Sequence, residues 1–281
     1  MSGPPPPAPP LRGDAHLYAC PHLHGVTPFR ILGNLYYVGD DHVGIHLIDT
    51  GDGLLLLDSG YPEMQAWLIH NIWRLGFRPS DIRMIVHTHA HFDHLGATCL
   101  LKELSGAVLC IGAADAQMMR ERPGLVFADC HPPCPACLFS PDVELQDNDT
   151  LTLGRTTLRV RAAPGHTPGT LAVFITVQDG SGTYIAGMHG GVGFNTLSRA
   201  YLNRHGLSGM REAFADGLTR LSSEHVDLLL GNHTAQTPLL ADRARMAEDP
   251  GGPNPFLNPE RWGQLLAGTS RAFARFLAED P

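Results

Sequence analysis

The stretch Met84–Gly96, MIVHTHAHFDHLG, decides the fold of this chain. It places four histidines and an aspartate within eight residues, directly after the apolar run Ile82–Val86. That run is short and rich in β-branched residues, which predicts a buried strand. Ordinary folds avoid so many titratable groups at the end of a buried strand, so the cluster indicates a functional site.

The spacing within the cluster suits a pair of metal ions. Residues two apart in an extended segment face the same side, so His89 and His91 can bind one ion together. Asp93 is again two residues further on, so it would face the same side in an extended segment. His94 lies next to it, where the chain turns into a helix. A single tetrahedral ion could not use all four side chains and keep a position open for chemistry. The cluster therefore offers two ligands to one ion and two to a neighbour.

Two later segments each supply a histidine at the end of a strand. APGHTPGT at residues 163–170 holds His166 on a turn flanked by proline and glycine. LLLGNHT at residues 228–234 holds His233 directly beyond a predicted strand. Loops at strand ends bring distant site residues together, so each ion can gain a third ligand from these histidines. His87 precedes this spacing, so it could support the ligands from behind or simply be exposed at the surface, and we expect it to be exposed.

Composition and charge argue against several classes of protein. Hydrophobic residues make up 43% and charged residues 17% of the 281 positions, as in ordinary globular proteins. The net charge of −8 argues against a nucleic-acid-binding protein. No apolar run is long enough to span a membrane, and MSGPPPPAPPLRG at residues 1–13 lacks the hydrophobic core of a signal peptide. We expect a cytoplasmic protein as written, or a periplasmic or secreted one if a leader was removed.

The order of the predicted elements indicates an α/β fold. We expect a proline-rich lead-in at residues 1–28, disordered at its start, and a single domain at 29–281. A Pro/Cys-rich insertion at about 121–141 interrupts that domain. A four-layer αβ/βα sandwich, with two sheets inside and helices outside, satisfies this order. Strands are predicted at 31–38, 42–49, 54–58, 82–86, 107–111, 150–163 (a hairpin), 170–177, 183–186 and 226–231, and helices at 62–76, 97–104, 113–120, 210–221 and 259–278.

The pattern His-x-His-x-Asp-His at residues 89–94 resembles the signature of the metallo-β-lactamase fold superfamily. LLLLDSG at 54–60, APGHTPG at 163–169 and GNH at 231–233 occur in the order of that family, and the resemblance runs from about Phe29 to the C-terminus. It implies the fold and metal binding, and it implies that Asp58 braces the metal loop without binding. It does not identify the substrate, because lactamases, thioesterases, lactonases and nucleases share the fold.

One departure from the family pattern separates its branches. Glyoxalase-type members place a bridging aspartate where this chain reads YIAGMHGG at 184–191, so Met188, or His189 in an alignment shifted by one, stands there. Asp93 is then the only acidic ligand, which disfavours glyoxalase-like and phosphodiesterase-like functions. The first subclass of metallo-β-lactamases uses a cysteine there, and no cysteine follows Cys137. The third subclass is most similar, which implies His89, His91 and His166 at a first zinc and Asp93, His94 and His233 at a second.

This resemblance implies a hydrolase with two Zn²⁺ per chain, a metallo-β-lactamase that confers antibiotic resistance. A zinc-bound hydroxide would open the β-lactam ring, with Asp93 and His94 as catalytic residues. The expected partner is a small β-lactam or another cyclic amide or ester, with no nucleic acid and no membrane. Residues that could contact the substrate or support the site are Met188, His189, Asn195, Thr234 and Asp58.

Two other functions remain open. A hydrolase of another small ester, lactone or thioester could keep the same metals, and the lack of a leader favours it because β-lactam resistance requires export. A metal-free binding protein on a degenerate fold is disfavoured, because all six ligand positions are occupied.

The insertion carries a separate motif, with Cys130, Cys134 and Cys137 in the spacing C-x3-C-x2-C. This spacing matches an iron–sulfur motif of radical enzymes, but that motif belongs at the start of a barrel and not in a proline-rich insertion. A structural metal site with His131, or loop thiols with one disulfide in an exported protein, are the other interpretations. We expect the insertion to shape the substrate pocket.

Overall fold

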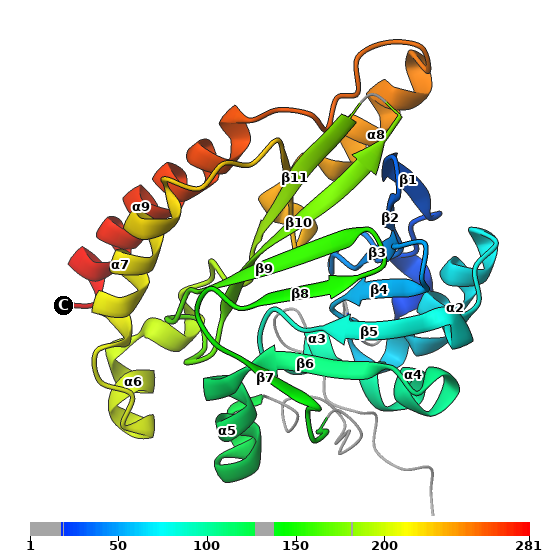
Figure 1. Ribbon diagram of the computed structural model, residues 1–281. Coiled ribbons are helices and arrows are strands. Elements are labelled where there is room, and N and C mark those ends of the chain that lie inside the picture. The colour runs from blue at the N-terminus through cyan, green and yellow to red at the C-terminus, as the bar shows by residue number, and fades with distance from the viewer. Residues whose placement is uncertain (1–17, 19, 127–137, 181) are drawn as a thin grey trace, which may run out of the picture.

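Two β-sheets lie face to face in the computed structural model, and helices cover their outer faces (Figure 1). The structure describes residues 18, 20–126, 138–180 and 182–281. In these residues one sheet has seven strands in the order β1-β2-β3-β4-β5-β6-β7, and the other has five in the order β12-β11-β10-β9-β8. The strands are β1 (Phe29–Leu32), β2 (Leu35–Tyr37), β3 (His46–Asp49), β4 (Leu54–Leu57), β5 (Ile82–Val86), β6 (Val108–Gly112), β7 (Val143–Leu145), β8 (Thr150–Leu153), β9 (Thr156–Ala162), β10 (Leu171–Asp179), β11 (Gly182–His189) and β12 (Leu228–Leu230).

Helices pack on both outer faces, with α2, α4 and α5 on the seven-stranded sheet and α7 and α9 on the five-stranded sheet. The α-helices are α2 (Gln65–Arg74), α3 (Phe92–Leu95), α4 (Thr98–Ser105), α5 (Ala113–Glu121), α6 (Arg199–His205), α7 (Met210–Leu221), α8 (Leu239–Glu248) and α9 (Glu260–Glu279). Short 3-10 turns are η1 (Pro21–Leu23), η2 (Pro62–Met64), η3 (Pro79–Asp81), η4 (Pro123–Val126), η6 (Asn195–Leu197) and η7 (Thr234–Gln236). None of the helices in the described residues combines the length and the hydrophobicity needed to cross a bilayer.

The side chains of each buried strand point alternately to the two faces of its sheet, so one strand can pack against a layer on either side. In β4, Leu54 and Leu56 join the hydrophobic cluster that contains Leu68 of α2, whereas Leu55 and Leu57 face the second sheet. Each fully buried leucine stabilises the fold by about 1.5–3 kcal/mol relative to an exposed one. This continuous apolar strand can therefore serve two cores at once.

The second sheet repeats this arrangement. Val173 and Ile175 of β10 pack in the core between the sheets, and Phe174 faces outward onto Trp262 of α9, with ring centroids 5.5 Å apart. Three hydrophobic clusters thus fill the three interfaces of a helix–sheet–sheet–helix stack. The predicted four-layer α/β sandwich is confirmed.

Several predicted elements were placed wrongly. The strand predicted at 31–38 is a hairpin of β1 and β2, because the chain turns at Gly33, whose φ is +48°. The strand predicted at 42–49 begins only at His46, because the Asp40 carboxylate accepts hydrogen bonds from the backbone N–H groups of His42 and Val43 and holds a turn there. Helices α6 and α8 were not predicted. The cysteine motif and the start of the lead-in lie outside the described residues.

The strand order gathers the site at one edge of each sheet. Strands β4, β5 and β6 pair in parallel, and so do β11 and β12. Carboxyl ends of parallel strands meet at the same edge, where the loops that follow them converge. Asp58 follows β4, the histidine cluster follows β5, and His233 follows β12.

Candidate metal centre

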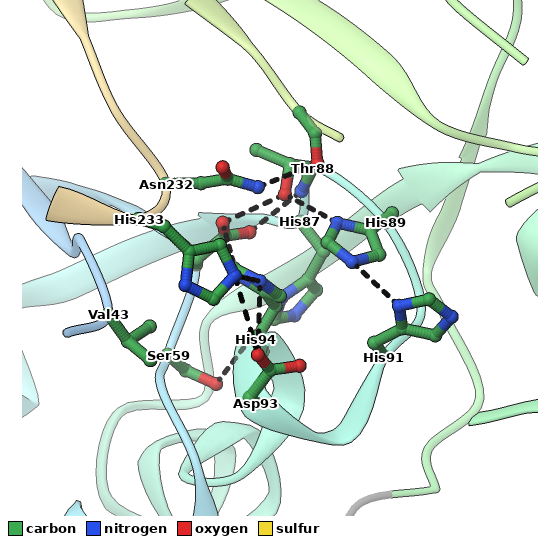
Figure 2. Close-up of polar contacts among 12 residues, drawn as sticks. Val43, Ser59, His87, Thr88, His89, His91, Asp93, His94, Asn232 and His233 are labelled. Carbon is green, nitrogen blue, oxygen red and sulfur yellow. Dashed lines mark hydrogen bonds and ion pairs between the residues drawn. The ribbon is translucent and has the colours of Figure 1, made fainter. Parts of the chain in front are cut away.

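The first group of candidate ligands combines the cluster after β5 with the loop before β10. The backbone is extended at His91, with φ −96° and ψ 151°, and α3 begins directly after it. His89 Nε2 and His91 Nδ1 then lie 3.1 Å apart (Figure 2). One donor atom from each of His89, His91 and His166 lies within 4.8 Å of the others. We name these three residues the first triad.

The second group combines α3 with the loop after β12. His94 Nε2 and His233 Nε2 point at each other across 3.3 Å, although the two residues are 139 positions apart (Figure 2). Asp93 Oδ2 lies 3.5 Å from His233 Nε2 and 3.7 Å from His94 Nε2. We name Asp93, His94 and His233 the second triad. His89 also lies within 4.8 Å of Asp93 and His94, so the two triads adjoin.

The donor atoms fit zinc in kind and in spacing. Zinc bonds of about 2.0–2.1 Å to nitrogen place two ligands of a tetrahedral ion about 3.3 Å apart. The donor atoms of the His89–His91 pair and of the three pairs in the second triad are 3.1 to 3.7 Å apart. Unprotonated ring nitrogens that face each other repel unless a cation lies between them. The residues present therefore fit a pair of zinc ions.

Asp58 sets the tautomers of two histidines. Its carboxylate accepts hydrogen bonds from Thr88 N–H (2.7 Å), Thr88 Oγ1 (2.8 Å) and His94 Nδ1 (2.9 Å). Because the single hydroxyl proton of Thr88 goes to Asp58, His89 Nδ1 must donate to Thr88 Oγ1 at 3.1 Å. Both histidines then present an unprotonated Nε2, the form that binds a metal.

The backbone of Asp58 supports this role. It is fully buried and has a φ of +60°, a left-handed conformation that costs an L residue about 1–2 kcal/mol. The structure thus keeps a strained, buried carboxylate behind the metal loop, as the resemblance implied for Asp58.

Electrostatics favour ligands that are ready to bind. Burial lowers the pKa of His166 and of His233 to about 4, and it lowers the pKa of His89 and His91 well below the ordinary value. These imidazoles are neutral at pH 7, as metal ligands must be. His166 Nδ1 donates to Gly193 O at 3.1 Å, which leaves its Nε2 for an ion.

The acidic ligand and its neighbour behave differently from the other histidines. Burial alone would raise the pKa of Asp93, but His94 and His233 hold it well below its ordinary value. Burial lowers the pKa of His94, but Asp93 and Asp58 outweigh it, so the pKa of His94 is raised. Asp93 and His94 therefore shift each other's pKa in the directions expected of an aspartate and a histidine in close contact.

A cleft with a volume of about 270 Å³ opens onto the triads. Five of the six candidate ligands line it, and His94 lies buried behind them. The rest of the wall mixes aromatic, apolar and amide side chains: Tyr18, His42, Phe92, Val192, Asn195 and Gln236 contribute to it. A small substrate could reach both triads from this cleft.

Tyr18 and His42 were not predicted as site residues. The Tyr18 hydroxyl donates to Asp93 Oδ2 at 3.3 Å and lies 3.1 Å from His42 Nε2. The Tyr18 ring packs edge-on against Phe92, with centroids 5.1 Å apart. In the sequence Tyr18 is recognisable as an aromatic residue after the proline run. That position does not indicate Asp93 as its partner, because Asp93 is 75 positions away.

Comparison with known proteins identifies the family. The model of the metallo-beta-lactamase superfamily matches residues 38–179, half of the 281-residue chain. The chain belongs to the metallo-beta-lactamase superfamily.

Solved structures of that superfamily match nearly the whole chain. BJP-1, a subclass B3 metallo-beta-lactamase of Bradyrhizobium japonicum, is 30% identical with a TM-score of 0.79, covering 92% of this chain and 96% of that one. The FEZ-1 metallo-beta-lactamase of Legionella gormanii is 26% identical with a TM-score of 0.82, covering 92% and 97%. The predicted similarity to the third subclass is thereby confirmed.

Curated relatives of this metallo-beta-lactamase superfamily member match over a shorter range. A hydroxyacylglutathione hydrolase of Anaeromyxobacter dehalogenans is 32% identical over 126 residues, which cover 45% of this chain. The match spans 39% of that relative's length, and similar shares of the others.

The other predicted contact residues of this superfamily member divide between cleft and core. Asn195 lines the cleft from η6. Met188 is fully buried in the core between the sheets, because alternation along β11 turns it away from the cleft. His189 faces the opposite side, 6.3 Å from the ring of Phe214, and its Nδ1 accepts from the backbone of Gly191. Neither of these two lines the cleft.

Thr234 and His87 also lie away from the cleft wall. The Thr234 hydroxyl donates to the backbone carbonyl of Asp41, so it faces away from the triads. His87 is fully buried behind the metal loop, where Nδ1 lies 3.2 Å from His94 O and Nε2 lies 3.2 Å from Thr98 Oγ1. The expectation that His87 is exposed is therefore wrong, because its side chain is buried against the backbone of a candidate ligand without reaching the cleft.

Proposed function

We propose that this chain is a dizinc hydrolase that opens the β-lactam ring. The first triad would hold one ion and the second triad the other. When bound, such a pair lowers the pKa of a water molecule toward neutrality and polarises a carbonyl group. The observation that carries the proposal is the presence of two adjoining triads. The donor atoms of the second triad and of the His89–His91 pair are 3.1–3.7 Å apart, and His166 brings a donor atom within 4.8 Å of that pair.

The chain's own residues have separable tasks in this proposal. Asp93, kept ionised by its histidine neighbours, accepts a hydrogen bond from the attacking water and orients it. Tyr18 donates to Asp93 Oδ2 and so fixes the direction of that carboxylate. Asn195, on the cleft wall near His166, offers an amide donor to the substrate. His94 anchors the second triad through its bond to Asp58.

Two observations favour a β-lactam as the substrate. The structural match to enzymes described as metallo-beta-lactamases covers more than nine-tenths of this chain. The second observation is that Asp93 is the only carboxylate in the two groups of candidate metal ligands that the described residues form. The bridging aspartate of glyoxalase-type members is replaced by Met188, which is buried in the core.

The second candidate is a hydrolase of a thioester, lactone or other small ester. The match to a protein named as a hydroxyacylglutathione hydrolase favours it. The same triads would serve this reaction, so the metal centre does not separate the two candidates.

The test is a substrate panel with the purified, zinc-loaded chain. It contains a chromogenic cephalosporin, a carbapenem, a hydroxyacylglutathione and a lactone. We expect cephalosporin turnover that a chelator abolishes and zinc restores. His166→Ala should lose turnover, whereas the control His225→Ala, on a side chain that is 71% exposed and outside the cleft, should keep it. Turnover of the thioester or lactone alone would assign the second candidate, and no turnover of any substrate would refute both.

A further inference from the structure

A buried carboxylate outside the predicted cluster joins the two loops that carry the first triad. Asp115 lies in the first turn of α5 and is fully buried. Its Oδ2 accepts a hydrogen bond from the backbone N–H of Ala90 at 2.7 Å, and its Oδ1 accepts from the backbone N–H of Gly169 at 2.6 Å. Ala90 stands between His89 and His91, so one bond fixes the backbone that carries both ligands.

A third hydrogen bond reaches the residue next to His166. Thr167 Oγ1 donates to Asp115 Oδ2 at 2.7 Å. Because that proton is committed, Thr170 Oγ1 donates to Thr167 Oγ1 at 2.7 Å and accepts from Thr167 N–H at 2.9 Å. The turn that carries His166 is thus closed on itself and tied to α5.

Two glycines allow the loops to approach this closely. A Cβ on Gly169 would lie 2.3 Å from the backbone nitrogen of Asp115, and a Cβ on Gly112 would lie 2.2 Å from Gly169 O. Side chains at either position would push the His166 loop away from α5. The close contact therefore depends on glycine on both sides, which keeps the Gly169 N–H within reach of the carboxylate.

Burying the charged carboxylate of Asp115 lowers the stability of the fold, so packing alone does not explain this residue. Burial raises the pKa of Asp115 to about 6, so the group is ionised at neutral pH without any cationic partner among its hydrogen bonds. A buried charge without a counter-charge is rarely kept by packing alone. The hydrogen bonds to Ala90 and Gly169 supply a reason of another kind, since they set the distance between two ligand-bearing loops.

We propose that Asp115 is a positioning residue that fixes the separation of His89 and His91 from His166 and so sets the metal affinity of the first triad. Its bonds reach backbone and hydroxyl groups next to the ligands, so it acts through the loops and is not itself a ligand. The inference rests on the proposed metal centre.

Asp115→Asn separates this role from packing, because the two side chains have nearly the same shape. The amide has one acceptor oxygen, and its NH₂ must face the N–H of either Ala90 or Gly169. One loop is then released. Asp142→Asn is the matched control, because the Asp142 carboxylate also accepts from a backbone N–H, that of Leu109, at 2.8 Å and away from the metal loops. Thr167→Val removes one of the three hydrogen bonds that Asp115 accepts, together with the bond from Thr170 Oγ1, and serves if Asp115→Asn does not fold.

Two readouts test the proposal. The first is competition of the full chain with a chromophoric chelator for zinc and for Co²⁺, whose visible spectrum reports on the ligand geometry. We expect the first-triad affinity to fall about 10–100-fold in Asp115→Asn, with a changed Co²⁺ spectrum. Thr167→Val should show a smaller loss and Asp142→Asn none. An affinity within threefold of wild type in both Asp115→Asn and Thr167→Val would overturn the proposal.

The second readout is hydrogen exchange in the metal-free chain. We expect faster exchange in segments 88–92 and 165–171 of Asp115→Asn, and unchanged exchange there in Asp142→Asn. Unchanged exchange in Asp115→Asn would overturn the positioning role even if metal binds. Failure of the wild-type chain to take up two ions would refute the proposed metal centre instead, so the two failures are distinguishable.

Discussion

Replacement of Asp58 by asparagine should disturb both triads at once. The Thr88 N–H that faces Oδ1 requires an acceptor, so the amide oxygen takes that position and the NH₂ takes the position of Oδ2. The NH₂ then faces Thr88 Oγ1 and His94 Nδ1, which the carboxylate had bonded at 2.8 and 2.9 Å. His94 Nδ1 must now accept, and its proton moves to Nε2, the nitrogen that faces His233. The second triad thereby loses one of the nitrogen atoms that could bind an ion.

The same change reaches the first triad through Thr88. Once its hydroxyl accepts from the asparagine, it can donate to His89 Nδ1, which reverses the tautomer of that ligand. Loss of such supporting bonds costs about 10–100-fold in metal affinity, or about 1.4–2.7 kcal/mol per ion. We therefore expect Asp58→Asn to bind both ions more weakly, with the larger loss at the second triad.

Competition with a chromophoric chelator measures these affinities, and zinc analysis after dialysis measures the number of ions retained. Asp41→Asn is the control, because it removes another carboxylate–imidazole contact, 2.8 Å from His24 Nδ1, at an exposed position. If Asp58→Asn retained both affinities within threefold of wild type, the tautomer argument would be refuted.

Three further predictions concern the acidic ligand, pH and metal removal. Asp93→Ala should lower kcat by at least about 100-fold while the circular dichroism spectrum stays near that of wild type; unchanged kcat would exclude Asp93 from the site. Burial lowers the pKa of His46, His87 and His189 to about 4, so between pH 6.5 and 4 the unfolded chain binds more protons than the folded chain. The stability that these groups contribute to the metal-free chain is then present above pH 6.5 and is lost as pH falls toward 4, by a few kcal/mol per pH unit. The lowered pKa values of His89, His91, His166 and His233 act in the same direction, and Asp115 offsets part of the loss because its pKa is raised. Urea unfolding at pH 7 and pH 5 checks the sign, and greater stability at pH 5 would contradict it. Removing zinc should lower Tm, because an ion held at 100 times its Kd stabilises the folded state by about 2.7 kcal/mol; equal Tm values with and without chelator would contradict tight binding.

Local spacing was enough to predict that the candidate ligands of the cluster lie close together, because His89, His91, Asp93 and His94 fall within six residues that follow β5 and run into α3. The two distant histidines followed from their positions at strand ends. The layers were predictable for a similar reason, since the apolar runs and helical periods require two sheets covered by helices.

The residues around the ligands depend on contacts that spacing does not encode. A shift of one residue along β11 exchanges the core face for the other face, so the direction of Met188 could not be read from its position. Tyr18 contacts Asp93 although the two residues are 75 positions apart in sequence. An acidic residue in the first turn of a helix usually lies at the surface beside the helix N-terminus, and nothing in the sequence around Asp115 distinguishes the buried case.

Segments far apart in the chain converge on the two triads, and anomalous diffraction at the zinc absorption edge tests that convergence most directly. Crystals grown with zinc should give two anomalous peaks per chain, one among His89, His91 and His166 and one among Asp93, His94 and His233. A single peak, or peaks away from both triads, would contradict the account.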